Sequence, residues 1–195
     1  GAQMQLMRYQ IAIHKIDHIF ISHLHGDHYL GLMGLLFSMH LQRRINDLHL
    51  YSQKGLDEII LLQLKYSKYS PNFNIIFHSF DATQINLLLD EDVFTVHTIP
   101  LNHKLDCAGF LFREKTKPRK INKEKLKDGM LLQHIALLKT GADVFDDHGN
   151  LLYLNREYTL PPSPSYSYAF CSDTARNEKM IEQLHHVDLL YHEAT

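Results

Sequence analysis

The stretch FISHLHGDH, residues 20–28, decides the fold class. It begins in an isoleucine-rich apolar run, residues 16–22, that predicts a short buried strand. Ligand-type side chains crowd the residues that follow. In open α/β sheets, sites form at the carboxyl ends of strands, where a loop aims side chains into a crevice. We therefore expect a metal site here, with four candidate ligands: His23, His25, Asp27 and His28.

The chemistry of this loop limits the choice of metal. Imidazole nitrogens and carboxylate oxygens suit zinc, and also manganese or iron. Gly26 is expected to let the backbone fold tightly, so that alternate residues point at different metals. The alternative is a solvated polar loop, but the pattern HxHxDH directly after an apolar strand favours metal binding.

Two further residues fit a dinuclear site. His103 follows a predicted strand at 93–99, and Asp173 follows another at 166–171. Each alone would be an ordinary turn residue. Beside HxHxDH, a carboxylate such as Asp173 can bridge two metals. His23, His25 and His103 would then hold one metal, and Asp27 and His28 the other.

The rest of the chain alternates between strand-like and helix-like segments. This alternation predicts an α/β layered domain with a largely internal sheet. Helices are expected at 1–9, 29–41, 56–69 and 175–184, and further strands at 48–51, 74–80, 107–112 and 187–191.

Composition bounds the function classes. The chain has 195 residues, 45% of them hydrophobic, which is enough for one domain with a core. The formal charge of −2 gives no bulk basic signature, so any nucleic-acid binding requires a local patch. Cys107 and Cys171 form no CxxC pair and predict reduced, buried thiols in a cytoplasmic protein. No apolar run is long enough for a membrane span, and the fifteen histidines favour a metal enzyme.

Residues 113–127 interrupt the pattern with eight Lys or Arg against two Glu. A helix-like run at 130–138 and a turn at 146–149 follow, and the segment closes in prolines 161–164. We interpret 113–164 as an inserted arm on a core made of 1–112 and 165–195. A solvated surface segment is the alternative interpretation of the charge run.

Four segments of the sequence resemble one family. HLHGDH matches the signature of the metallo-β-lactamase superfamily. Within it, residues 20–36 resemble the zinc loop and following helix of ribonuclease Z, and residues 171–174 (CSDT) resemble its GDT element, with Ser172 in place of Gly. Residues 192–195 (HEAT) are a much more specific element of that branch, and residues 100–112 resemble the segment with its next histidine ligand.

The resemblance implies an αββα sandwich with two zinc ions, manganese being possible, that cleaves RNA rather than DNA. The substrate would be a tRNA precursor, cut after the discriminator base, and the protein would act as a homodimer. His192 and Glu193 would lie near the site in a supporting role, with Asp27 orienting the attacking water. The arm would bind tRNA, although its usual Gly-Pro motif is missing. The candidate substrate-binding residues are Lys115, Lys117, Arg119, Lys120 and Lys123.

Two alternatives remain. One is another hydrolase of the superfamily, of phosphodiesterase, arylsulfatase or lactonase type. The other is a non-catalytic RNA-binding remnant. The family pattern also includes an N-terminal motif and a final ligand histidine that this sequence lacks, so the expectation is an incomplete sandwich whose second metal site is incomplete and whose activity is weak or absent.

Overall fold

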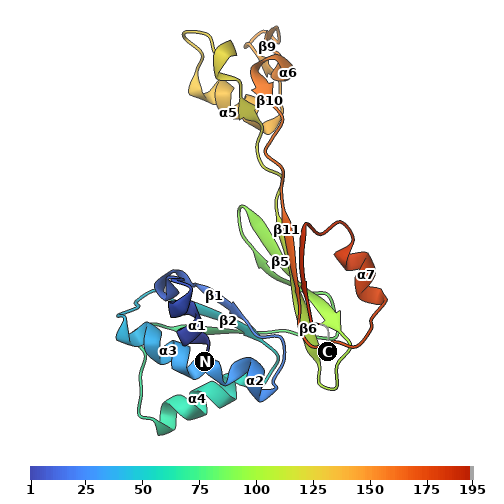
Figure 1. Ribbon diagram of the computed structural model, residues 1–195. Helices are drawn as coiled ribbons and strands as arrows, with labels where there is room; N and C mark the ends of the chain where they lie inside the picture. Colours follow the sequence, from blue (N-terminus) through green and yellow to red (C-terminus); the bar gives the residue numbers. More distant parts are fainter. Residues whose placement is uncertain (194–195) are drawn as a thin grey trace.

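The structure is a computed structural model in which residues 1–193 are described. Two β-sheets face one another, each with helices on its outer side, and a small lobe stands on a narrow stalk above the second sheet (Figure 1). This layering is the predicted αββα arrangement, and the fold class is confirmed. No helix among the described residues is long and apolar enough to cross a membrane.

The first sheet is parallel, with strand order β1-β2-β3. Leu48 and Leu50 of its middle strand are fully buried in the same core cluster as Leu36 and Ile60, which lie on the helices before and after that strand. The elements of this half are α1 (Ala2–Arg8), η1 (Ile13–Lys15), β1 (His18–Phe20), α2 (Gly26–Tyr29), α3 (Gly31–Leu41), β2 (Leu48–Ser52), α4 (Leu56–Tyr66) and β3 (Ile75–Ser79).

The second sheet has strand order β12-β11-β6-β5-β4 and is antiparallel except for the β11–β12 pair. Its outer face packs on α7 through Met180, Ile99 and Leu111. Its elements are β4 (Leu87–Asp90), β5 (Phe94–Leu101), β6 (Cys107–Glu114), β11 (Ser167–Cys171), α7 (Lys179–Leu184) and β12 (Leu189–His192).

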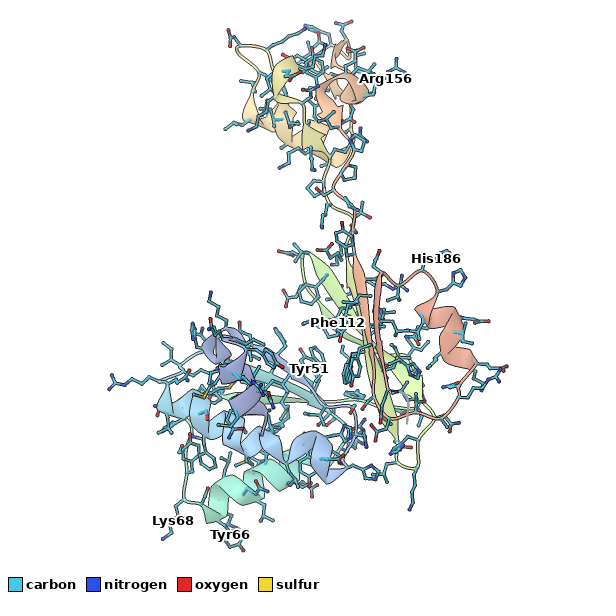
Figure 2. All side chains as sticks on the ribbon, viewed as in Figure 1. Tyr51, Tyr66, Lys68, Phe112, Arg156 and His186 are labelled. Atoms are coloured by element: carbon cyan, nitrogen blue, oxygen red, sulfur yellow. The ribbon has the colours of Figure 1, made fainter. Side chains whose placement is uncertain are left out.

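Aromatic rings fill the space between the sheets. Phe20 stacks on Tyr51 with ring centroids 4.5 Å apart, and its edge meets Phe110 and Phe112 of the other sheet. Figure 2 labels Tyr51 and Phe112 on the facing sides of the two sheets. This contact holds the carboxyl ends of β1, β5 and β11 near one another.

The lobe is built from residues 119–160 and has its own small core of Leu138, Val144 and Tyr158. The buried side chain of Asn155 donates hydrogen bonds to the carbonyls of Leu138 and Ala142. Its elements are β7 (Lys120–Ile121), η2 (Lys123–Lys125), α5 (Leu132–Thr140), β8 (Val144–Phe145), β9 (Leu151–Tyr153), α6 (Asn155–Tyr158) and β10 (Thr159–Leu160).

Two local features of the lobe follow from its turn residues. Gly141 ends α5 with a φ of 100°, the left-handed conformation that glycine adopts without a Cβ penalty. The Asp146 carboxylate accepts hydrogen bonds from the backbone N–H groups of His148 and Asn150, which closes the β8–β9 hairpin at the turn expected from the sequence.

Several local expectations were wrong. The HLHGDH segment is not entirely loop, because α2 begins at Gly26. Gly26 has no positive φ, so its turn does not require glycine's left-handed freedom. The helix expected from residue 175 begins only at Lys179, because the Ala175 N–H bonds the Asn102 carbonyl at 2.7 Å. No sequence pattern indicated β4, the edge strand.

Gly109 provides a test of the packing between β6 and β11. A Cβ there would lie 2.5 Å from the Phe170 carbonyl oxygen, a backbone atom that cannot move without disturbing the sheet. Gly109→Ala should therefore lower the free energy of unfolding by roughly 1–3 kcal/mol, the usual cost of overpacking. Urea unfolding followed by circular dichroism measures this.

Gly34→Ala is the matched control. A Cβ at Gly34, inside α3, meets the end of the flexible Gln3 side chain, which can move aside. Replacing a helical glycine by alanine should raise stability by up to about 1 kcal/mol. Equal effects of the two substitutions would contradict this account of Gly109.

Candidate metal centre

Three loops carry the candidate ligands to one edge of the sandwich. The loop after β1 leads into α2, the loop after β5 carries His103, and the loop after β11 carries Asp173. A bridge between Asn102 and Ala175 joins the last two loops, and the Thr174 hydroxyl accepts a hydrogen bond from the Asn102 N–H at 3.0 Å. Ligands far apart in the sequence are thereby held together.

Four of these side chains, His23, His25, His103 and Asp173, form one cluster whose donor atoms all lie within 4.8 Å of one another. His23 Nε2 lies 3.0 Å from His25 Nδ1, which lies 3.2 Å from His103 Nε2. An Asp173 oxygen lies 3.8 Å from His23 Nε2. Donors around a tetrahedral zinc ion stand roughly 3.3 Å apart, given zinc–nitrogen bonds of about 2.0–2.1 Å. The donor set fits such an ion.

A second group lies beside the first. His28 Nε2 is 3.4 Å from Asp27 Oδ2 and 3.4 Å from Asp173 Oδ1. The two oxygens of Asp173 therefore face different groups, Oδ2 towards His23 and Oδ1 towards His28. Three donors meet here among the residues described, and the Asp27 side chain is 81% exposed. This second position is open to solvent.

The shifted pKa values of His23 and Asp173 favour the deprotonated forms that bind a cation. Burial, followed by the nearby His28, lowers the pKa of His23 to about 4, so its imidazole is neutral at neutral pH. Burial acts to raise the pKa of Asp173, but a hydrogen bond with Glu193 and the surrounding imidazoles outweigh it, and the pKa is lowered. Metal ligands must be deprotonated, and both groups satisfy that condition.

Cys107 lies against the cluster, and its position was not foreseen from the sequence. Its Sγ is 3.4 Å from His23 Nδ1, on the side of the ring away from the other donors. Burial raises the pKa of the Cys107 thiol to about 12, so it stays protonated and is a poor metal ligand. Both cysteines are free and buried, as predicted.

Two residues of the predicted HEAT element, His192 and Glu193, are described by the structure, and they differ in their relation to the cluster. Glu193 lies beside the cluster, in the lining of the hollow that Asp173 also lines. His192 is exposed, and its Nδ1 contacts the carbonyl of Glu193 rather than any candidate ligand. Residues 194–195 lie outside the described residues. A hollow of about 290 Å³ opens beside the second group, lined by Asp27, His28, Phe170, Ser172, Asp173, Tyr191 and Glu193.

The basic residues proposed for substrate binding are distant from this edge. Lys115 pairs with Asp90 at 2.5 Å and Lys117 with Glu114 at 2.7 Å, so both are engaged at the foot of the stalk. Arg119 donates to the Thr159 hydroxyl at 2.7 Å. Lys120 and Lys123 are exposed in the lobe and form no ion pair with the described residues.

The lowered pKa of His23 makes a prediction about stability and pH. Because the folded value of about 4 lies below the unfolded value of 6.5, the unfolded chain binds this proton more readily. The contribution of His23 to the free energy of unfolding is thus fully present above pH 6.5 and is lost as the pH falls towards 4. In the presence of a chelator, His23→Gln should reduce the loss of unfolding free energy between about pH 7 and pH 5.

Urea unfolding at both pH values measures that loss. His148→Gln, a substitution of an exposed histidine in the lobe hairpin, should leave the wild-type dependence unchanged. A His23→Gln variant as acid-sensitive as the wild type would refute the prediction.

Comparisons with known proteins agree with this geometry. The family model described as "Anti-Pycsar protein Apyc1" matches residues 1–113, more than half of the chain. A protein named ribonuclease Z from Cytophaga hutchinsonii is 49% identical over the whole chain and 62% of its own length. Another from Bacteroides fragilis (strain YCH46) is 40% identical over the whole chain and 64% of its own length.

Two solved structures share the fold. The crystal structure of human tRNase Z, short form, covers the whole chain and 64% of its own chain with a TM-score of 0.64 at 22% identity. The metallo-β-lactamase fold protein YhfI from Bacillus subtilis covers 97% of this chain and 54% of its own, with a TM-score of 0.51 at 16% identity.

The chain thus spans less than two thirds of the length of these relatives. Their names confirm the resemblance that HLHGDH and HEAT suggested. The chain belongs to the family described as Anti-Pycsar protein Apyc1, its fold is that of metallo-β-lactamase fold proteins, and along its whole length it is similar to proteins named ribonuclease Z.

Proposed function

We propose that this chain carries the core of a metal-dependent endoribonuclease that removes 3′ trailers from tRNA precursors. The observation that supports this most strongly is the extent of the similarity. Relatives named ribonuclease Z align with all 195 residues, so the similarity includes the arm and the segment after it as well as the ligand loops.

The donor set supports zinc as the metal, with manganese as an alternative. His23, His25, His103 and Asp173 would hold one ion, and Asp27, His28 and Asp173 would hold a second. When bound, two such ions lower the pKa of a bridging water and neutralise charge on the phosphate oxygens.

The protein's own side chains have separate roles in this proposal. Asp27, exposed at the mouth of the hollow, would orient the attacking water by accepting a hydrogen bond from it. Glu193 lines the same hollow as Asp173 and would support the site from there. We assign His192 a supporting role only, because its Nδ1 contacts the backbone carbonyl of Glu193.

The arm would bind RNA away from the site of cleavage. Lys120 and Lys123 are the best candidates for phosphate contacts, because they are exposed and unpaired among the described residues. Lys115, Lys117 and Arg119 would contribute less, because protein groups already satisfy them. Contacts of this kind read the shape and charge of RNA rather than its sequence.

We further propose that two copies of the chain associate and that the protein is cytoplasmic. Exposed apolar side chains support association: Leu189, Leu190 and Tyr191 of the edge strand β12 are each about half exposed or more. Two buried free thiols suit a reducing compartment. Sedimentation of a species with the mass of one chain would refute the association.

Another phosphodiesterase of the same fold is the second candidate. The Apyc1 model supports it, because the matched residues 1–113 include the HxHxDH loop and His103 but end before the arm. Hydrolysis of a small phosphodiester such as bis(p-nitrophenyl) phosphate, without cleavage of RNA, would favour this candidate.

Cleavage of a 3′-extended tRNA precursor tests the main proposal. We expect a new 3′ end directly after the discriminator base in the presence of zinc or manganese. His23→Ala should reduce the rate by at least about 100-fold, because it removes the buried ligand of the first cluster. Mapping the product end by adaptor ligation and sequencing gives the position of the cut.

A longer protein makes a negative result interpretable. The relatives are longer than this chain, so the assay should include a chimera that adds the flanking segments of the Cytophaga hutchinsonii relative. Cleavage by the chimera and its loss on His23→Ala would support the proposal. A metal-loaded chimera that leaves the precursor intact would refute it.

The arm proposal predicts a change in the salt dependence of RNA binding. Lys120→Ala with Lys123→Ala should weaken tRNA binding and reduce the slope of log affinity against log salt by roughly 1 for each phosphate that the arm no longer neutralises. Fluorescence anisotropy at several salt concentrations measures the slope. Lys68→Ala is the control, since Lys68 lies at the opposite end of the molecule from the arm (Figure 2). The same slope in the arm variant and the control would rule out these interactions.

A further inference from the structure

Two buried serines lie behind the histidines of the candidate metal centre. Ser22 and Ser172 are 5% and 3% exposed, and His23 beside them is completely buried. The two hydroxyls are 3.2 Å apart although the residues are separated by 150 positions. Ser22 follows a strand of the first sheet and Ser172 a strand of the second. This hydroxyl pair therefore joins the two sheets at the metal site.

The two ring nitrogens of His23 face different groups. One faces the two serines, and the other faces the remaining candidate ligands. Its Nδ1 lies 3.1 Å from the Ser22 hydroxyl, while its Nε2 faces His25 and Asp173. A neutral imidazole has one N–H and one bare nitrogen, and only the bare nitrogen can bind a metal. If Nε2 is the metal-binding atom, Nδ1 carries the proton and donates a hydrogen bond to the Ser22 hydroxyl, which lies closer to it than Cys107 Sγ at 3.4 Å.

The donors and acceptors of the remaining hydrogen bonds are then fixed. The Ser22 hydroxyl, occupied as an acceptor by His23, donates its own proton to the Ser172 hydroxyl. Ser172 in turn donates to Asp173 Oδ1, a long hydrogen bond of 3.4 Å. The sequence of donors ends on a carboxylate, which only accepts.

Ser172 also lies next to the second histidine. His28 Nδ1 is 3.4 Å from the Ser172 hydroxyl, while His28 Nε2 faces Asp27 and Asp173. The same reasoning places the proton of His28 on Nδ1, from where it donates to Ser172. The Ser172 hydroxyl thus contacts His28, a ligand of the second proposed ion, directly. It reaches His23, a ligand of the first, through Ser22.

We propose that Ser22 and Ser172 are positioning residues that fix the tautomer and orientation of His23 and His28, and so couple the two halves of the metal centre. This inference rests on the proposed metal centre. Ser172 stands where the ribonuclease Z pattern has glycine, which has no hydroxyl to offer. Groups behind a ligand typically change metal affinity by about 10–100-fold when removed.

Zinc affinity tests the proposal directly, without any enzymatic assay. Competition with a chromophoric chelator at neutral pH should give about 10–100-fold weaker binding for Ser22→Ala and for Ser172→Ala. Ser172→Thr restores a hydroxyl and should recover most of the affinity. Ser52→Ala is the matched control: Ser52 is 4% exposed, but its hydroxyl donates to the Gln53 carbonyl and contacts no candidate ligand among the described residues, so its loss should leave zinc affinity unchanged.

The double variant separates a connected pair from two independent effects. Because Ser172 acts on His23 through Ser22, the double variant should lose much less than the product of the two single losses. Losses that simply multiply would overturn the connection between the serines. Thermal unfolding of the metal-free variants identifies any that fail to fold, and these are replaced by Ser22→Gly or Ser172→Gly.

Histidine tautomers can be read from long-range ¹H–¹⁵N spectra of the metal-free chain. We expect His23 and His28 as Nδ1–H tautomers in the wild type, and a mixture for His23 in Ser22→Ala. Unchanged zinc affinity and unchanged tautomers in the serine variants would overturn the inference. A wild-type chain that binds no zinc would overturn the proposed metal centre instead, and the tautomers would still decide the role of the serines.

Discussion

The Asp173 carboxylate faces two histidine groups at once, and the rest of the site depends on that position. Its two oxygens lie 3.8 Å from His23, in the loop after β1, and 3.4 Å from His28, in the helix α2 that this loop leads into. Asp173 itself follows β11 of the other sheet. The carboxylate reaches both only when the two sheets are packed at the correct separation. The aromatic contact of Phe20 and Tyr51 with Phe110 sets that separation.

Sequence patterns predict the parts of the site that are local in the chain. The spacing of HxHxDH after an apolar strand is visible in residues 20–28, and the strand ends before His103 and Asp173 follow from periodicity. The contacts between these parts are not visible. The contact of Ser22 with Ser172 spans 150 positions, and the bridge from Asn102 to Ala175 shortens α7 although helical propensity would extend it. Tertiary contacts decide such details, and no local signal reports them.

In the arm, too, the sequence does not reveal which contacts the charged side chains make. Composition identifies residues 113–127 as basic, but it cannot distinguish free charges from paired ones. Lys115 and Lys117 form ion pairs beside the stalk, which reduces the charge that they can offer to a phosphate. Lys120 and Lys123 belong to the lobe and form no ion pair with the described residues. The electrostatic footprint of the arm is therefore smaller than its sequence indicates, and it lies at the end away from the core.

Burial lowers the pKa of His23 and at the same time favours metal binding by this residue. The same desolvation that lowers its pKa keeps the imidazole neutral, and a neutral imidazole is the form that binds metal. A buried polar ring is costly unless its nitrogens are satisfied. On one side the Ser22 hydroxyl satisfies Nδ1, and on the other the lone pair of Nε2 is directed at the remaining ligands. A cation at that position would satisfy Nε2 and offset the cost, so the burial of His23 favours both metal binding and folding around the metal.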